Sequence, residues 1–275
     1  MNLPGLDIDW TRQGPARIRS GAPLPVETML RGRPLTEVAE LLPRLFNLCG
    51  AAQGAAFRLA VGLPQAGDPG AEIIRDHMTR LMVIWPRLLG LPAQPGDFAL
   101  PAPAALAGWL QSDAPFARLM AAIKARLPGE IRLPDASDDL IAAGVACENT
   151  PAGRRADHPL MRAAEADHGR GLFWRALGRL VDLVETKAGH LPEPRLIGPG
   201  AALAPAARGA YLLRAAHSDG RLTALSRITP TDALIAPGGL LARALSDLTD
   251  RDHAELALSI LDPCLPVNLH EAPHA

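Results

Sequence analysis

Three side chains suited to metal chemistry lie within nine positions near the C-terminal end of the chain: the carboxylate of Asp262, the thiol of Cys264 and the imidazole of His270. Pro263 and Pro266 restrict the backbone on either side of the thiol. Thiolate and imidazole are soft-to-borderline ligands suited to nickel, iron or zinc. The residue types alone leave a second interpretation open, in which Cys264 is a small buried hydrophobe in a C-terminal tail.

This stretch resembles the C-terminal metal-binding signature of the NiFe-hydrogenase large subunit, Asp-Pro-Cys-x-x-Cys-x-x-His. Asp262, Pro263, Cys264 and His270 occupy the matching positions, and Val267 stands where the family has its second cysteine. The resemblance implies that Cys264 binds a metal. It further implies that Asp262 and His270 support the thiol without binding the metal, with His270 orienting the cysteine loop by hydrogen bonds.

A second thiol, Cys49, lies in the N-terminal quarter of the chain. Cys49-Gly50 resembles part of the first metal motif of the same family, Arg-x-Cys-Gly-x-Cys-x-x-x-His. Ala52 replaces the second cysteine of that motif and Ala56 replaces its histidine. Taken alone, Cys49 is a small hydrophobe at a helix end. The resemblance implies instead that it is a second metal ligand, and that Ala52 and Val267 face the same pocket.

Two internal segments add to this resemblance. Residues 147–154 resemble the large subunit's Glu-Thr-Gly-Pro-Leu-Ala-Arg, with matches at Glu148, Pro151 and Arg154. Arg208 matches the arginine that lies over the metal centre in the family. The resemblance implies supporting roles near the metal for Glu148 and Arg208. Without it, Arg154 would be assigned to a solvated, charged turn.

The missing cysteines carry most of the functional information. In the family four thiolates hold nickel and iron, and the second cysteine of each pair bridges the two metals. Cys49 and Cys264 are retained here, whereas Ala52 and Val267 have no donor atom. Because two thiolates cannot build the four-sulfur bimetallic site, we expect that the protein is not a hydrogenase and not an enzyme. The pattern argues against nickel, although the residues leave nickel binding open.

The two retained thiolates predict a site for one metal fragment. An Fe(CN)2(CO) unit needs few protein ligands, because its diatomic ligands already occupy coordination positions, and Arg208 is suited to donate charge-assisted hydrogen bonds to cyanide nitrogens. The pattern resembles the HupK/HoxV family of hydrogenase accessory proteins. That resemblance implies a maturation scaffold that holds the fragment transiently, with hydrogenase maturation chaperones and the hydrogenase large subunit as partners.

Two other functions remain open from the sequence. A metal-free mimic of the large subunit would recruit maturation chaperones through its surface. A redox enzyme would use Cys49 and Cys264 as a dithiol pair. Metal analysis and infrared spectroscopy distinguish these functions, because only the scaffold carries bands from CO and CN.

Bulk properties exclude several classes of partner. Among the 275 residues, 28 are basic and 29 are acidic, so nothing predicts nucleic-acid binding. The opening residues lack a basic region followed by an apolar run, and no apolar stretch approaches the roughly 20 residues of a membrane span, so we expect neither a signal peptide nor membrane insertion. Three widely separated cysteines make a poor disulfide framework, which favours the cytoplasm.

Hydrophobic periodicity predicts a mainly α-helical fold with a small antiparallel β-hairpin, of the α+β class. With 48% hydrophobic but only 4% aromatic residues, the core must consist of Leu, Ala, Val and Ile. The resemblance implies a trimmed large-subunit-like core in one domain over residues 1–275, with a loop-rich lead-in at 1–34. Helices are predicted within 35–45 with an interruption at Pro43, and at 71–90, 106–127, 171–187, 240–248 and 253–260.

The hairpin is predicted from 206 to 225, around the turn Ser218-Asp219-Gly220. Short strands are expected near 131–133, and residues 192–205 are expected to form a loop. Thr36 is the predicted N-cap of the first helix. His77, on the apolar face of its helix, is interpreted as a core histidine with a polar partner rather than as a ligand.

Overall fold

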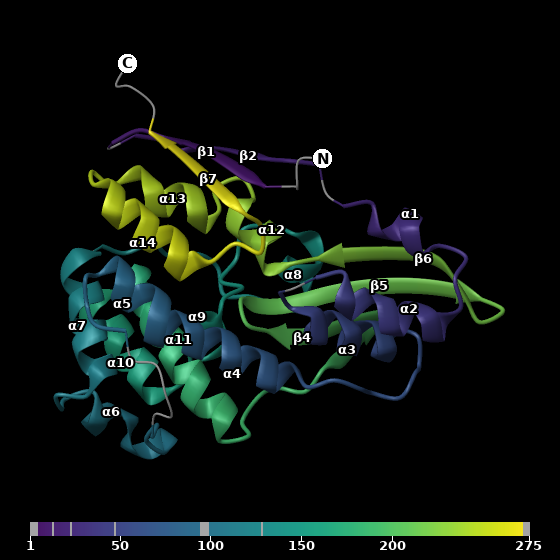
Figure 1. Ribbon diagram of the computed structural model, residues 1–275, viewed down its shortest axis with the longest axis horizontal. Coiled ribbons are helices and arrows are strands. Elements are labelled where there is room, and N and C mark those ends of the chain that lie inside the picture. The colour runs from purple at the N-terminus through teal and green to yellow at the C-terminus, as the bar shows by residue number, and fades with distance from the viewer. Residues whose placement is uncertain are drawn as a thin grey trace.

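The protein folds into a helical body and two β-sheets (Figure 1). This computed structural model describes residues 5–12, 14–22, 24–46, 48–93, 99–127 and 129–271. In Figure 1 most of the helices lie on the left, the larger sheet on the right and the smaller sheet at the top. The prediction of a mainly helical α+β fold is confirmed, with more strands than the single predicted hairpin. The assignment of residues 1–275 to one domain stays a prediction.

Helix α11 (Leu172–Lys187) is the centre of the helical body. Most of its 16 residues are buried, including Arg175, Arg179 and Asp182. Buried charges require partners, and the partners of Arg179 and Asp182 lead to the site described below. The helices packed against α11 are α4 (Pro69–Thr79), α7 (Pro115–Arg126), α9 (Pro151–Arg154), α10 (Pro159–His168) and α14 (Arg251–Leu261).

The predicted helical segments are confirmed, with local breaks. Helix α4 continues through a π-helical turn at Arg80–Ile84, a feature that often marks functional positions. Pro43 does interrupt the first predicted helix. Thr36 is not its N-cap, because the helix begins one residue earlier, after Pro34. Further short helices of the body are α5 (Trp85–Leu88), α6 (Leu106–Trp109) and α13 (Leu240–Ser246), whereas α8 (Asp138–Ala143) packs against the larger sheet.

The larger sheet is antiparallel, in the order β3-β4-β5-β6. Its strands are β3 (Arg195–Gly198), β4 (Ala201–Ala206), β5 (Gly209–Ser218) and β6 (Arg221–Ile228). The predicted hairpin is confirmed as β5 and β6 around Asp219-Gly220. The prediction of a loop at 192–205 is wrong, because β3 and most of β4 lie in this range. The buried β4 was missed because it is mostly alanine, which has a low strand propensity.

Two helical segments cover one face of this sheet (Figure 1). They are α2 (Leu35–Leu41), which continues into a 3₁₀ turn at Leu42–Arg44, and α3 (Gly50–Ala60). Helix α3 presents Ala52, Ala55 and Ala56 to the sheet alanines, so the helix lies close to the strands. This close packing positions the beginning of α3, where Cys49 is found.

The smaller sheet joins the two ends of the described chain. Strand β1 (Leu6–Trp10) pairs antiparallel with β2 (Arg17–Ser20) and parallel with β7 (Val267–Glu271). Leu6, Ile8 and Trp10 are fully buried at alternate positions of β1. The prediction of a loop-rich lead-in at 1–34 is therefore wrong for these strands and for α1 (Val26–Leu30). The strict apolar–polar alternation of residues 6–10 is the pattern of a half-buried strand, and the Pro- and Gly-rich composition of the segment as a whole concealed it.

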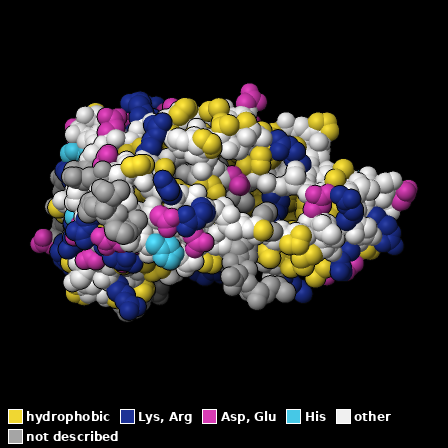
Figure 2. Space-filling view, turned by 90° about the horizontal axis from the view of Figure 1, so that it is seen from above, with side chains coloured by type: hydrophobic (Ala, Val, Ile, Leu, Met, Phe, Trp, Pro, Cys, Tyr) yellow, Lys and Arg dark blue, Asp and Glu magenta, His cyan; other side chains and the backbone are white. Residues whose placement is uncertain are grey.

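Two further sequence expectations concern short strands and the surface. Residues 131–133 form no strand, since the segment is held by a single backbone hydrogen bond from Ile131 to the carbonyl of Arg170. Figure 2 shows acidic and basic side chains interspersed on the face viewed from above. Within the described ranges, no helix is long and apolar enough to cross a bilayer.

The buried face of β1 allows a matched test of the unpredicted sheet. We expect Ile8→Ala to lower the free energy of unfolding by about 2–5 kcal/mol, because Ile8 is completely buried. Ile18→Ala is the control, since Ile18 is the cross-strand partner of Ile8 and is only half-buried. Urea unfolding of both variants checks this, and equal losses would contradict the placement of β1 in the core.

Candidate metal-binding site

The two thiols predicted as ligands come together between the sheet and the helical body. Cys49 precedes the first residue of α3, and Cys264 lies three residues beyond the end of α14. Each thiol affects the pKa of the other, so the two side chains lie close together. Both thiols line a cavity of about 560 Å³, with Cys49 buried and Cys264 half-buried. Segments more than 200 positions apart thus place two sulfur donors at one cavity.

The backbone is strained beside each thiol. Cys49 has φ of 62° and Asp262 has φ of 51°, values in the left-handed region that L-residues seldom adopt. Gly50 has no room for a side chain, because a Cβ there would lie 2.4 Å from the carbonyl oxygen of Pro43. Strained conformations of this kind persist where surrounding contacts enforce them, often at functional sites.

Glu72 of α4 holds the start of α3. The thiol of Cys49 does not cap the helix; instead, the backbone N–H of Ala51 donates to Glu72 Oε2 over 2.9 Å. Glu72 Oε1 is buried and has no hydrogen-bond partner among the described residues, and burial raises the pKa of this carboxyl. Sequence reasoning missed Glu72, since a cap supplied from another helix has no local signature.

Thr231 holds the second thiol. The backbone N–H of Cys264 donates to Thr231 Oγ1 over 2.8 Å. Thr231 is buried near the start of α12 (Pro230–Ile235), a helix fixed by a capping box between Thr229 and Asp232. The sequence showed the Thr-Pro-Thr segment but gave no indication of this contact.

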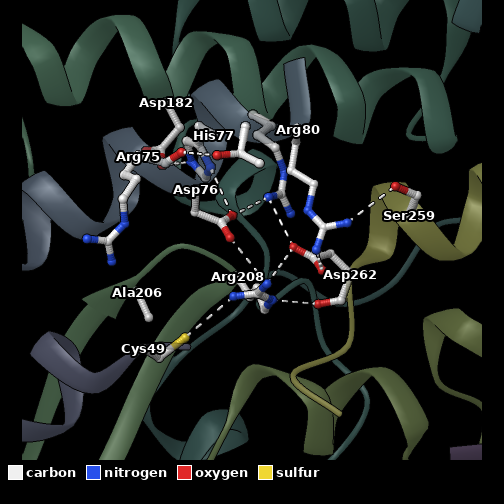
Figure 3. A network of polar contacts seen from close by, with 12 residues as sticks. Cys49, Arg75, Asp76, His77, Arg80, Asp182, Ala206, Arg208, Ser259 and Asp262 are labelled. Carbon is white, nitrogen blue, oxygen red and sulfur yellow. Dashed lines mark hydrogen bonds and ion pairs between the residues drawn. The ribbon is translucent and has the colours of Figure 1, made fainter. Parts of the chain in front are cut away.

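Arg208 lies between the thiols and the helical body (Figure 3). Its Nε donates to the carbonyl oxygen of Asp262 over 2.9 Å, and its Nη2 lies 3.0 Å from the Asp262 carboxylate. The same Nη2 lies 3.3 Å from Asp76 Oδ1, and Nη1 lies 3.9 Å from Cys49 Sγ. Although burial opposes its charge, Asp262 and Cys264 raise the pKa of Arg208. The guanidinium therefore stays charged beside the thiols.

The β4–β5 turn that carries Arg208 is supported by the segment 147–154. The side chain of Asn149 accepts from the N–H of Ala210 and donates to its carbonyl oxygen. Gly209 has φ of 144° and lies against Asn149, so a Cβ there would be 2.3 Å from the Asn149 carbonyl oxygen. Arg154 Nη1 also donates to the carbonyl oxygen of Gly209 over 3.0 Å. This segment thus positions the arginine of the site indirectly.

Two more arginines converge on the same carboxylates. Arg80 Nη2 lies 2.5 Å from Asp262 Oδ1. Arg179 Nη1 lies 2.9 Å from Asp76 and 3.3 Å from Asp262. Burial alone would raise the pKa of Asp76, but a neighbouring imidazole and the charges of Arg179 and Arg208 hold it below its usual range. Ionised carboxylates therefore join α4, α11 and the cysteine loop.

The ion-pair network continues away from the thiols through His77. His77 Nε2 lies 2.9 Å from Asp182, and its ring is fully buried. Asp182 also accepts from Arg154 and Arg155. The interpretation of His77 as a partnered core histidine is confirmed. Arg154, by contrast, belongs to a largely buried ion pair rather than to a solvated turn.

The two thiols differ in acidity. The hydrogen bond from Cys49 and the charge of Arg208 lower the pKa of Cys264, against the effect of burial. The hydrogen bond to Cys264, together with burial, raises the pKa of Cys49. Cys264 is therefore the first of the pair to become a thiolate, which is the form that binds metal.

Of the predicted site residues, Cys49, Cys264, Arg208 and Asp262 lie together. Glu148 does not join them, because its buried carboxylate pairs with Arg175 and accepts from Thr150. Whether the thiols bind metal stays a prediction.

Three other predicted positions lie elsewhere. His270 is exposed on β7, with its Nε2 atom 3.9 Å from Asp7 Oδ1. The structure therefore does not show the expected hydrogen bonds from His270 to the described part of the cysteine loop. Thr231 holds that loop instead. Neither Ala52 nor Val267 lines the cavity, so that expectation is wrong. Ala52 is buried on the face of α3 that packs against the larger sheet. Val267 is the first residue of β7, which pairs with β1, and its side chain packs against the helical body.

Protein donors at the site are few. Among the described residues, no group of three or more His, Cys, Asp and Glu side chains is arranged to hold a metal ion. A metal held at Cys49 and Cys264 must therefore bring further ligands with it.

Comparison with known proteins assigns the family. The chain is 50% identical over 273 residues to the hydrogenase expression/formation protein HupK of Rhodobacter capsulatus, with 92% of each chain covered. The chain belongs to the HupK family of hydrogenase expression/formation proteins. A shorter match, 37% over 82 residues, relates it to the hydrogenase expression/formation protein HoxV of Cupriavidus necator and covers 26% of this chain and 21% of that one. No family model matches.

The fold of this HupK family member is that of a hydrogenase large subunit. The Ni-Fe-Se hydrogenase of Desulfovibrio vulgaris Hildenborough aligns with a TM-score of 0.58 at 12% identity, over 92% of this chain and 93% of that one. The [NiFeSe] hydrogenase of Desulfomicrobium baculatum aligns with a TM-score of 0.55 at 12% identity, over the same shares. At this identity the likeness concerns the fold alone, and it confirms the predicted large-subunit-like core.

The buried ion pairs predict a specific response to acid. Burial would raise the pKa of Asp182, but Arg154 and His77 hold it well below the ordinary value of 3.8. The Asp182 carboxyl therefore binds a proton more readily in the unfolded state than in the folded state. Its ion pairs stabilise the folded protein at neutral pH, and this stabilisation is lost as pH falls below about 4. We expect Asp182→Asn to cost about 3–5 kcal/mol at pH 7 and to flatten the acid limb of the stability curve.

Urea unfolding between pH 7 and pH 3 measures both effects. Asp157→Asn is the control, since Asp157 is exposed and forms an ion pair with the exposed Arg162. An unchanged acid limb in Asp182→Asn would show that Asp182 is not ionised in the folded protein.

Proposed function

We propose that this protein acts in hydrogenase maturation as a scaffold that transiently holds an Fe(CN)2(CO) fragment on Cys49 and Cys264. The observation that carries the proposal is the convergence of these thiols at a cavity, beside the charged Arg208. Membership of the HupK family and the large-subunit-like fold support a role in hydrogenase maturation. The iron cargo is inferred from the donor set.

The number of donors suits a metal fragment that carries its own ligands. Two sulfur atoms leave most coordination positions of a bare metal ion open to water. In Fe(CN)2(CO) the diatomic ligands fill those positions, so two thiolates suffice to attach the fragment. Nickel has no bridging sulfur at this site, because neither Ala52 nor Val267 supplies a donor or lines the cavity.

The charge around the site suits an anionic complex. In the part of the chain that the structure describes, the ion pairs of Asp76 and Asp262 involve three arginines, Arg80, Arg179 and Arg208, so positive charge in this cluster exceeds negative charge by one. Fe(II) with two cyanides is neutral, and two thiolates make the bound complex dianionic. Charge-assisted hydrogen bonds to such a complex are stronger than those to a neutral one.

The scaffold holds its cargo less firmly than a four-thiolate site does. Each metal–sulfur bond that is absent here lowers the affinity relative to a large subunit with its full set of cysteines. Transfer of the fragment toward such a subunit is therefore favourable. The protein thus passes the fragment on rather than turning over a substrate.

Serine substitution of the thiols tests the proposal. Protein isolated anaerobically with the maturation machinery is expected to show iron together with CO and CN stretching bands. Cys49→Ser and Cys264→Ser are expected to lose iron loading and to impair hydrogenase maturation, because a serine hydroxyl is a far poorer ligand for iron. Cys147→Ser is the control, since Cys147 is a buried thiol in a separate apolar cluster.

Hydrogenase activity in cells carrying the double serine variant completes the test. Near-normal activity would contradict the scaffold and would favour a metal-free mimic that recruits maturation chaperones. Wild-type protein without CO and CN bands would contradict it as well.

A further inference from the structure

The donors of Arg208 are already committed to protein atoms. Nε, Nη1 and Nη2 point at Asp262, Cys49 and Asp76, and the side chain is 3% exposed. Arg208 is not among the residues that line the cavity. Arg208 therefore supplies positive charge next to the thiols, but its N–H groups do not face a ligand in the cavity.

A different arginine lines the cavity itself. Arg227, on β6, lies in the wall that also contains Cys49 and Cys264. Its Nη1 donates to Gln53 Oε1 over 3.2 Å and to Tyr211 Oη over 3.3 Å. Its guanidinium also stacks on the ring of Phe46, 4.4 Å from the centroid. These contacts fix the plane of the guanidinium.

Arg227 retains free donors and an uncompensated charge. Within the described ranges, no carboxylate forms an ion pair with Arg227, and its Nε and Nη2 donate to no acceptor. Asp232, the acidic residue in the same cavity wall, is occupied by the N–H and hydroxyl of Thr229. A half-buried cation with spare N–H groups is suited to an anionic or strongly accepting ligand.

The position of Arg227 is tied to the thiols. Gln53 lies one helical turn after Cys49 in α3, and its N–H donates to the Cys49 carbonyl oxygen over 3.0 Å. Residues four apart lie on the same side of a helix. Tyr211, the other partner of Arg227, lines the same cavity as both thiols. The guanidinium is thereby held in the wall of the cavity that both thiols line, whereas Arg208 is not part of that wall.

We propose that Arg227 would donate to a cyanide of the thiol-held iron fragment and so select cyanide-bearing cargo. This inference rests on the proposed function. The cyanide nitrogen carries negative charge and accepts hydrogen bonds well, whereas the carbonyl oxygen of bound CO accepts them poorly. The rest of the cavity wall suits the CO ligand because it is largely apolar; it includes Leu24, Leu45, Leu48, Ile235, Leu265 and Pro266.

Arg227→Gln tests this role. Loss of one charge-assisted hydrogen bond is expected to reduce the iron loading of anaerobically isolated protein about tenfold. In the fraction that remains loaded, one CN stretching band should shift while the CO band moves less. Arg221→Gln is the control, because Arg221 lies on the same strand, is exposed and donates to the Gly32 carbonyl oxygen.

Arg227→Lys provides the second variant. It keeps the charge but loses the planar pair of donors, so loading should fall less than in Arg227→Gln while the CN band still shifts. Thermal unfolding of each variant separates a folding defect from a binding defect. Wild-type loading with unshifted CN bands in Arg227→Gln would overturn the role of Arg227 and leave the scaffold intact. Absence of CN and CO bands from the wild type would overturn both.

Discussion

The site depends on the carboxylate of Asp262. Asp262 directly follows α14, and its backbone is in the left-handed conformation. Its carboxylate forms ion pairs with Arg80, Arg179 and Arg208, which belong to three different parts of the fold. These contacts attach the loop of Cys264 to α4, to α11 and to the β4–β5 turn. Removing one partner from such a buried cluster leaves an uncompensated charge, at a cost of about 3–5 kcal/mol. The position of Cys264 relative to Cys49 is thus fixed by electrostatics as well as by packing.

The two arginines near the thiols have different roles. Arg208 is enclosed by acceptors from the protein and makes the site positive from behind. Arg227 lines the cavity and, among the described residues, has donors without an acceptor. Because α3 carries both Cys49 and Gln53, one helix positions a sulfur ligand and the anchor of the second arginine. A site with sulfur, charge and an apolar cavity already in place is suited to capture a preformed fragment.

The convergence of Cys49 and Cys264 was predictable from the sequence, because family motifs report on contacts between distant segments. The motifs alone were enough to assign Cys49, Arg208 and Cys264 to one site. Helices were predictable from their periodicity, and the β5–β6 hairpin from its Asp-Gly turn. Strand β4 was not, since an alanine-rich strand is favoured by burial rather than by propensity. Glu72 and Arg227 were not predictable either, because their contacts join distant segments and leave no local sequence pattern. The positions of Val267 and His270 were missed because β7 pairs with β1, which places both residues away from the thiols.

Iron K-edge X-ray absorption tests the central claim most directly. On protein isolated anaerobically with the maturation machinery, the account predicts two sulfur scatterers at about 2.3 Å from iron, the length of a metal–thiolate bond. Shorter scattering paths from carbon-bound diatomic ligands should accompany them, and the sulfur shell should vanish in the double serine variant of Cys49 and Cys264. Iron without a sulfur shell, or a sulfur shell that survives both substitutions, would contradict the account.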